Sequence, residues 1–356
     1  MRRANNGRVI FMHDIRAIIN DVYTVVENHR ISEGKYRRWI RQNDEGKRNL
    51  GVNEYGCADA SNILYMIGRF PSTLESRLAH YTAMQELQSS ESGMFVEATH
   101  HTIHTTAHVI AALELYDQKA LYPIKDLEYL KDKEALYKFL DELPWDDDPW
   151  SASHRGAGLY AAMVLNGQAD ADWQKLYFDW LYENADPETG FWRKGCVLSG
   201  GKPVFHHLAG TFHYLFNHEY AHMPLRYPEK VIDTCIALLE RYVTHANEAS
   251  MKIDPNDNWR FGDKISFAEI DWVYCLTRAM RQSPHRFEEG KNALYAFADD
   301  YIGWLSQIDR LSLDDFNDLH ALFGCVCCLA ELQSALPGYI KTEKPLKLVL
   351  DRRPFI

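Results

Sequence analysis

The sequence predicts an all-α fold, an (α/α)6 toroid of six helical hairpins with one central cleft. A unit of two helices recurs at intervals of roughly 45–60 residues, which is the mark of a repeat architecture. The two helices of a unit differ in character, since the first is apolar on nearly all sides and the second is amphipathic. No segment shows the sustained alternation of apolar and polar residues that is typical of a strand.

The first helices of the units are expected to form an inner ring. Segments 109–113, 157–165 and 322–332 are apolar nearly all round, and such helices are buried on every side. The predicted inner helices span about 61–69, 100–116, 149–165, 206–220, 266–280 and 313–334.

The second helices carry polar faces and are expected to form an outer ring. Four of them are predicted at about 72–88, 172–184, 228–245 and 286–308. An N-terminal helix over 13–28 keeps the i, i+3, i+4, i+7 spacing of apolar residues and closes the outer ring. The chain is therefore expected to be a single domain over residues 1–356.

Composition limits the classes of partner. The formal net charge is −11, and no basic run suits a nucleic-acid phosphate backbone, so nucleic acid is excluded. No apolar stretch reaches the ~18 residues of a membrane span. The cysteines are odd in number, and several fall in apolar helical runs, which favours reduced thiols and a cytoplasmic location. The expected partner is a small-molecule or oligosaccharide substrate, and the sequence requires no cofactor.

Flat, amphipathic side chains are abundant: 9 Trp, 20 Tyr, 16 Phe and 16 His. They suit either a core rich in aromatic rings or a cleft lined with rings, as in sugar and isoprenoid sites. Composition alone leaves both open.

Two turns carry a family resemblance. The segment Asp186-Pro187-Glu188-Thr189-Gly190-Phe191-Trp192 precedes one inner helix, and Gly93-Met94-Phe95 precedes another. This arrangement resembles the six-hairpin glycosidases and also the terpenoid cyclases and protein prenyltransferases, which share the toroid. The resemblance implies the fold. No Asp-x-Asp-Asp motif and no recognisable prenyltransferase zinc-ligand group occurs, so no catalytic residue can be transferred by motif.

Candidate site residues are the polar and aromatic ones at the openings of the inner helices, where backbone N–H groups and helix dipoles converge. His154, His207, Asp148 and Asp271 are the predicted catalytic residues. His213 and His320 occupy equivalent openings. The predicted substrate-binding residues are Asp59, His100, His101, His104, Trp150, Arg155, Trp192, His206, Trp272 and Asp318. We expect His101, His154, His207 and Asp271 to border one cleft.

The leading functional hypothesis is a carbohydrate-active enzyme, a glycoside hydrolase using facing carboxylates. A lyase or sugar isomerase is the nearest variant, in which His154, His206 or His207 transfers a proton and Arg155 holds an anionic group. Trp150, Trp192 and Trp272 would stack on sugar faces. An isoprenoid cyclase or transferase, and a non-catalytic binding toroid, are the alternatives.

Two motifs match metal patterns only formally. His218-Glu219-Tyr220-Ala221-His222 spells His-Glu-x-x-His, but it lies at the C-terminal end of a predicted inner helix, away from the expected cleft. Asp314-Asp315-Phe316-Asn317-Asp318 spells the Asp-Asp-x-x-Asp pattern of magnesium diphosphate sites. His100 and His104 share one helix face, without a third ligand at a diagnostic spacing. No metal is predicted.

Overall fold

The computed structural model describes residues 3–5, 8–10, 13–199, 201–244 and 265–356, and 60% of the structure is helix and 3% is strand. The predicted all-α class is confirmed. The strands form three two-stranded sheets: β1 (Arg3–Asn5) with β2 (Arg8–Ile10), β3 (His13–Asp14) with β6 (Ile340–Lys341), and β4 (Arg30–Ser32) with β5 (Lys35–Tyr36). The first and third pairs are antiparallel, and β3 runs parallel to β6. Among the described helices, none combines the length and apolarity that crossing a membrane requires.

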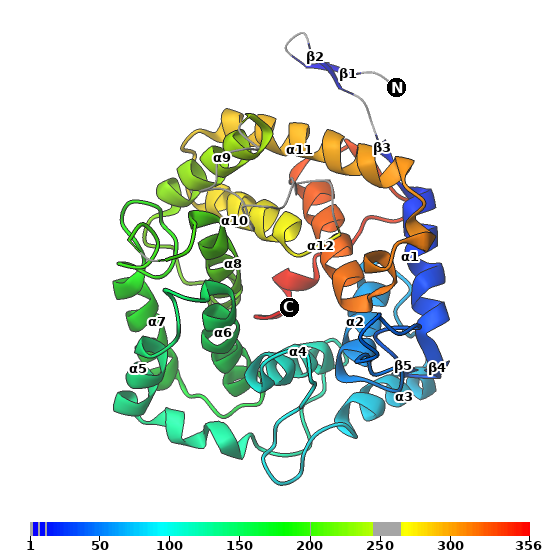
Figure 1. Cartoon of the computed structure of the whole chain (residues 1–356), viewed down its shortest axis with the longest axis vertical. Helices are drawn as coiled ribbons and strands as arrows, with labels where there is room; N and C mark the ends of the chain where they lie inside the picture. Colours follow the sequence, from blue (N-terminus) through cyan, green and yellow to red (C-terminus); the bar gives the residue numbers. More distant parts are fainter. Residues whose placement is uncertain (1–2, 6–7, 11–12, 200, 245–264) are drawn as a thin grey trace.

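Six helices contact one another in succession, and the last contacts the first. Figure 1 shows them around the centre of the molecule. Each corresponds to one predicted inner helix. In chain order they are α2 (Glu54–Met66), α4 (Thr102–Glu114), α6 (Pro149–Leu165), α8 (Val204–Ala221), α10 (Ala268–Gln282) and α12 (Leu319–Ala335).

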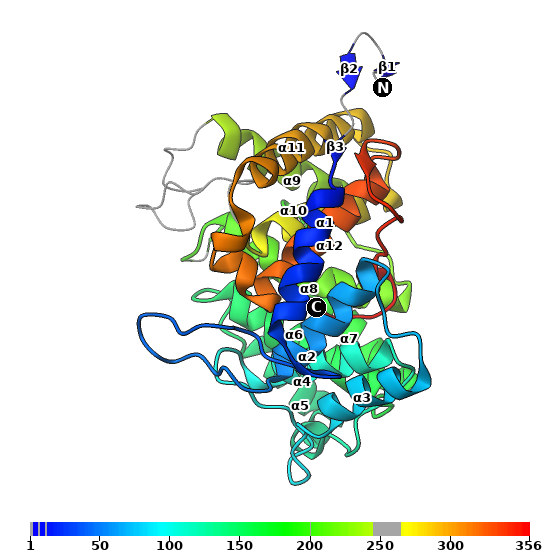
Figure 2. The same cartoon turned by 90° about the vertical axis from the view of Figure 1, so that its right-hand side faces the viewer.

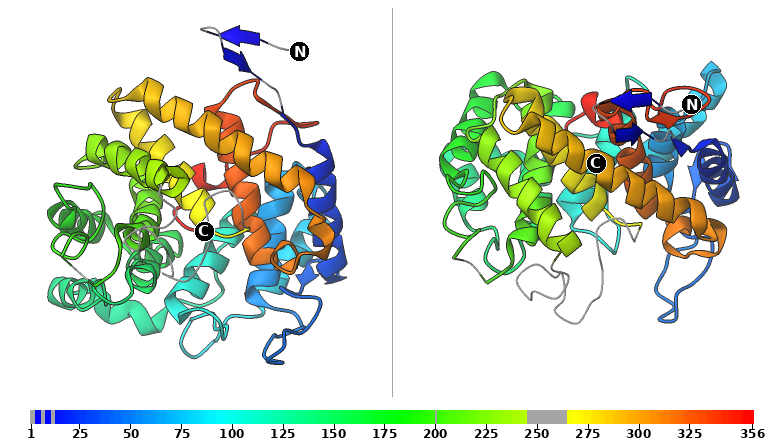
Figure 3. Two further views of the ribbon diagram at one scale, coloured as in Figure 1. Left: turned by 45° about the horizontal axis from the view of Figure 1, so that its top comes forward. Right: turned by 90° about the horizontal axis from the view of Figure 1, so that it is seen from above.

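The other α-helices lie outside these six, as the views in Figures 1, 2 and 3 show. The helix predicted over 13–28 is α1 and contacts α2. The predicted outer helix 228–245 is α9, and residue 245 lies outside the described part. The outer α-helices are α1 (Arg16–His29), α3 (Leu74–Gln85), α5 (Lys133–Asp141), α7 (Ala171–Asn184), α9 (Pro228–Thr244) and α11 (Phe287–Gln307). Short 3-10 helices are η1 (Lys125–Lys131), η3 (Arg310–Ser312), η4 (Asp315–Asn317) and η5 (Val349–Asp351).

Capping side chains move two helix starts away from their predicted positions. Helix α2 begins at Glu54 rather than near residue 61, because Asn53 accepts hydrogen bonds from the N–H groups of Tyr55 and Gly56. Asp59 therefore lies inside the helix. Helix α12 begins after Asp318, whose side chain accepts from the His320 N–H, while η3 and η4 occupy the preceding residues.

The last residues of the chain lie within the ring of inner helices (Figure 1). Arg353 and Phe355 are fully buried, and Ile356 is buried as well. Asn217 of α8 donates a hydrogen bond to the Pro354 carbonyl at 3.0 Å, which fixes this segment against the inner helices. No pattern in the sequence predicts this position for the C-terminal segment.

A buried ionic network joins α10, α12 and η5. The fully buried guanidinium of Arg278 donates to both carboxylate oxygens of Glu331, at 2.8 and 2.6 Å, and to Asp351 at 2.6 Å. Glu331 is also buried. A buried charge whose partner is removed is strongly destabilising.

We expect Glu331→Gln to lower the free energy of unfolding by about 3 kcal/mol, because it leaves Arg278 short of one buried negative charge. Urea unfolding followed by circular dichroism measures the change. Asp179→Asn is the matched control, since Asp179 pairs with Lys175 on the exposed face of α7 and should leave the unfolding midpoint almost unchanged. Equal effects of the two substitutions would contradict this assignment.

Candidate functional site

Six histidines from four inner helices converge at the centre of the ring, and we call them the histidine cluster. His104 and His108 lie one turn apart on the same face of α4, and His100, which precedes the helix by two residues, stacks on the ring of His104. The ring of His104 lies 4.3 Å from His154, measured between centroids, and His154 lies 4.5 Å from His213. The cluster is His100, His104, His108, His154, His213 and His320.

Asp59 of α2 binds two members of the cluster. Its carboxylate accepts a hydrogen bond from His108 Nε2 at 2.7 Å and one from His320 Nδ1 at 3.1 Å. Asp59 and His108 are fully buried, and His320 is 4% exposed. One carboxylate thus joins α2, α4 and α12.

Tyr55 fills the space between these rings. Its ring stacks on His100 and His108, with centroid distances of 4.5 and 4.9 Å, and His320 meets it edge-on at 4.5 Å. The Tyr55 hydroxyl lies 2.6 Å from His104 Nδ1, so it forms a hydrogen bond there. Tyr55 connects the Asp59 side of the cluster to His104.

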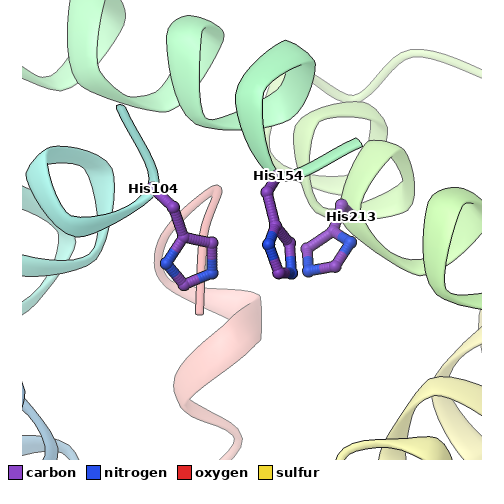
Figure 4. A group of neighbouring side chains, drawn as sticks. All are labelled: His104, His154 and His213. Atoms are coloured by element: carbon purple, nitrogen blue, oxygen red, sulfur yellow. The ribbon is translucent and has the colours of Figure 1, made fainter. Parts of the chain in front are cut away.

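His104, His154 and His213 form a second group within the cluster, drawn in Figure 4. Each offers one ring nitrogen, and these nitrogens lie within 4.8 Å of one another. Ser153 Oγ lies 2.9 Å from His213 Nδ1. The ring of Phe355, from the C-terminal segment, lies 5.0 Å from the His104 ring.

Burial keeps the imidazoles of four cluster members, His104, His154, His213 and His320, neutral at pH 7. Loss of solvent lowers the pKa of His104 and of His154 well below the usual value, and lowers the pKa of His213 and of His320 to about 3. Burial alone would raise the pKa of Asp59, but the interactions with His108 and His320 outweigh it and hold that pKa below its usual range. The centre therefore combines a carboxylate with the uncharged imidazoles of these four histidines.

An unpaired buried cation lies beside this centre. None of the three guanidinium nitrogens of Arg353 has a hydrogen-bond partner among the described residues, and Arg353 is fully buried. Its guanidinium faces the ring of Phe323 at 5.6 Å, and the His108 ring lies 5.9 Å from the same Phe323. His108 Nδ1 is also buried without a described partner.

Several predicted site residues belong to this centre or lie beside it. Asp59, His100, His104 and His154 are among them, together with His213 and His320 at the other predicted openings. Asp318 forms an ion pair with Arg38 at 2.7 Å, and Arg38 faces the Tyr55 ring. His101 caps α4, and its charge interaction with Arg155 places these two residues near each other.

The remaining predicted residues have other contacts. Asp148 is an exposed N-cap of α6, and Trp150 is partly buried next to it. The buried indoles of Trp192 and Trp272 donate to the carbonyls of Leu181 and Cys235, which places both rings in the core rather than at an open sugar-binding surface. The other three positions are His206, partly buried at the start of α8, His207, buried in the same turn, and Asp271, buried in the first turn of α10.

In the two segments that match metal-binding motifs, the acidic side chains form ion pairs with arginines. Glu219 of the His-Glu-x-x-His segment lies 3.3 Å from Arg281 and 3.6 Å from Arg278, and His222 is the left-handed C-cap of α8, with φ 55°. The two histidines therefore do not share a regular helix face. In the Asp-Asp-x-x-Asp segment, Asp314 pairs with Arg41 and Arg48, and Asp318 pairs with Arg38.

Four residues in or beside the site were not predicted from the sequence: Tyr55, Arg38, Ser153 and Arg353. His108 had a usable signal, because it lies one turn beyond His104 on the same face. No sequence signal points to Arg353, because its place beside the site results from the folding of the C-terminal segment into the centre. Comparisons with protein-family models, curated proteins and solved structures gave no match for this chain.

His218 gives the fold a predicted acid sensitivity. Burial lowers its pKa to about 4, while an unfolded imidazole titrates near 6.5. As pH falls from about 6.5 to 4, the unfolded chain takes up this proton first, so stability is lost over that window. We expect the wild type to lose about 2–4 kcal/mol more than His218→Gln between pH 7 and pH 4. Urea unfolding at several pH values measures this, and parallel curves would contradict it.

His207 is the predicted catalytic residue whose role is most directly testable. Its Nδ1 donates to the Trp192 carbonyl at 2.8 Å, and the side chain is fully buried. These contacts favour a structural role, so we expect His207→Ala to lower the free energy of unfolding by about 1–3 kcal/mol. Melting temperature and turnover are measured on the same variant. Lost turnover with unchanged stability would instead support the catalytic role that the sequence suggests.

Proposed function

We propose that this protein is an enzyme that acts on a carbohydrate by proton transfer, as a lyase or a sugar isomerase. We also assign it to the (α/α)6 toroids, which the closed cycle of contacts from α2 to α12 and back to α2 supports. The observation that carries the functional proposal is the carboxylate of Asp59 holding two buried imidazoles.

Asp59 sets the tautomer of both histidines. An ionised carboxylate only accepts hydrogen bonds, so His108 Nε2 and His320 Nδ1 must both carry protons. His108 Nδ1 and His320 Nε2 are then left as lone pairs. A carboxylate that orients an imidazole in this way stabilises the imidazolium formed when the ring takes a proton, which is the logic of general-base catalysis.

The polar centre favours this chemistry over the alternatives. An isoprenoid cyclase would need an apolar chamber, whereas this centre holds six histidines and an aspartate. A glycosidase would need an acid and a second carboxylate facing each other. Of the four carboxylates chosen from the sequence, Asp59 binds histidines, Asp318 binds Arg38 and Asp148 caps a helix. The fourth, Asp271, is buried in the first turn of α10, and the carboxylate that interacts with it is Glu269 of the same turn.

Further residues suit a sugar substrate that carries an anionic group. The unpaired guanidinium of Arg353 is buried near Asp59, and Arg155 lies near His101. Trp150 is partly exposed at the start of α6 and could stack on a sugar face. His100 and His154 are the partly exposed members of the cluster, so a ligand would approach from their side.

Proton abstraction from carbon is the step that tests this proposal. The protein is incubated in D2O with aldoses, ketoses and uronate oligosaccharides, and proton NMR follows each sample. A lyase creates a new alkene signal, and an isomerase exchanges a carbon-bound proton for deuterium. Glycosidic cleavage with neither event would support the hydrolase instead. No reaction with any member of the panel would contradict a carbohydrate-active enzyme of this type.

Asp59→Asn should lower turnover of the substrate so found by about 10²–10⁴, the usual contribution of general acid–base catalysis. The amide keeps the shape of the carboxylate, but it can donate a proton to one imidazole and so favours the wrong tautomer. Melting temperature is measured alongside. A rate loss no larger than that of Asp148→Asn, which alters an exposed cap, would contradict the role of Asp59.

A further inference from the structure

We propose that His104, His154 and His213 together bind one divalent transition-metal ion of the zinc class, with a coordination position left open. The three histidines come from three successive inner helices, α4, α6 and α8, and their nitrogens lie within 4.8 Å of one another (Figure 4). Three histidines with one open position is a common arrangement of catalytic zinc.

The spacing is close to that of a ligated ion. Nitrogens about 2.0–2.1 Å from a tetrahedral zinc ion lie about 3.3 Å apart. The present nitrogens are within 4.8 Å, so side-chain rotations that close the group by about 1.5 Å bring them to bonding distance. Ring centroids 4.3 and 4.5 Å apart, from His154 to each neighbour, place His154 between the other two.

The hydrogen bonds of His213 leave its Nε2 free to bind a metal. Ser153 Oγ donates its proton to the Trp150 carbonyl at 2.8 Å. At His213 Nδ1, 2.9 Å away, Ser153 therefore accepts rather than donates. Nδ1 carries the proton, and Nε2 presents a lone pair. A metal-bound histidine almost always donates its other ring N–H to such a partner.

His104 has the same pattern with a different partner. The Tyr55 hydroxyl lies 2.6 Å from His104 Nδ1 and 3.4 Å from Thr105 Oγ1. When it donates to Thr105, it accepts from His104 Nδ1, and His104 Nε2 is left as a lone pair. Neither nitrogen of His154 has a hydrogen-bond partner in the described part of the chain. Ser153 thus orients His213, the Tyr55 hydroxyl orients His104 in the same way when it donates to Thr105, and His154 is uncommitted.

The competing metal candidates are less suitable. Asp59, His108 and His320 also lie within ligand distance of one another, but the atoms that would face a shared ion are already joined by hydrogen bonds of 2.7 and 3.1 Å. The His218 and His222 pair is interrupted by the left-handed conformation of His222.

The full-length protein is stripped with a chelator, and Zn²⁺ is added in a calorimetric titration. Co²⁺ gives an independent signal, since its visible absorption reports coordination geometry. We expect one ion per chain at this group. His154→Ala should weaken binding by more than about 100-fold, because even loss of an outer hydrogen-bond partner costs 10–100-fold. Ser153→Ala should weaken it by about 10–100-fold.

His222→Ala is the matched control, because it removes a histidine of the other candidate motif and should leave affinity unchanged. Asp59→Asn is a second control, because it alters the neighbouring candidate group of Asp59, His108 and His320, and it should also leave the affinity for the ion unchanged. His154 is partly exposed and makes no described hydrogen bond, so its substitution should preserve the helical circular dichroism spectrum. Absence of Zn²⁺ and Co²⁺ binding, or loss of binding in His222→Ala or Asp59→Asn but not in His154→Ala, would overturn the assignment. These readouts do not depend on a carbohydrate substrate.

Discussion

The buried carboxylate of Asp59 is the constraint around which the centre of this protein is arranged. It lies on α2, and it accepts hydrogen bonds from His108 on α4 and from His320 on α12. Helices α2 and α12 are distant in sequence but adjacent in space, so this interaction lies where the cycle of inner helices closes. A buried carboxylate without such donors would be costly, and closure of the cycle therefore depends on the two histidines reaching it. Their orientation follows from the same requirement.

Ion pairs also connect each end of α12 to another part of the chain. Its N-cap, Asp318, pairs with Arg38 from the segment before α2, and Glu331 near its C-terminal end pairs with Arg278 of α10. Each pair crosses from α12 to a different part of the chain. Because α12 itself is apolar nearly all round, its apolar surface does not select one neighbour over another. The two charged pairs therefore fix the position of α12 along its neighbours, which apolar contacts alone do not determine.

Periodicity and capping made much of this fold predictable, while contacts between distant segments were not. Inner helices such as 157–165 are recognisable because no face of them is polar, and Pro149 after Asp148 correctly marks the start of α6. Asp59 was assigned to a helix opening because the capping role of Asn53 was missed. Trp192 and Trp272 were predicted to bind sugar because composition does not distinguish a buried ring from an exposed one. The C-terminal segment with Arg353 and Phe355 enters the centre through packing that has no local sequence pattern.

The histidine cluster divides into two halves that differ in what fixes their protons. In one half, an ionised carboxylate orients His108 and His320, so an imidazolium formed there would be stabilised. In the other half, the neutral hydroxyls of Ser153 and Tyr55 contact His213 and His104, and no carboxylate is hydrogen-bonded to either ring among the described residues. A neutral partner holds a ring in place without stabilising a proton on it, which suits a lone pair committed to a cation. Tyr55 contacts both halves, since its ring stacks on His108 and its hydroxyl reaches His104. With the proposed ion held by His104, His154 and His213, a substrate bound between the two halves would meet a proton acceptor on one side and a Lewis acid on the other.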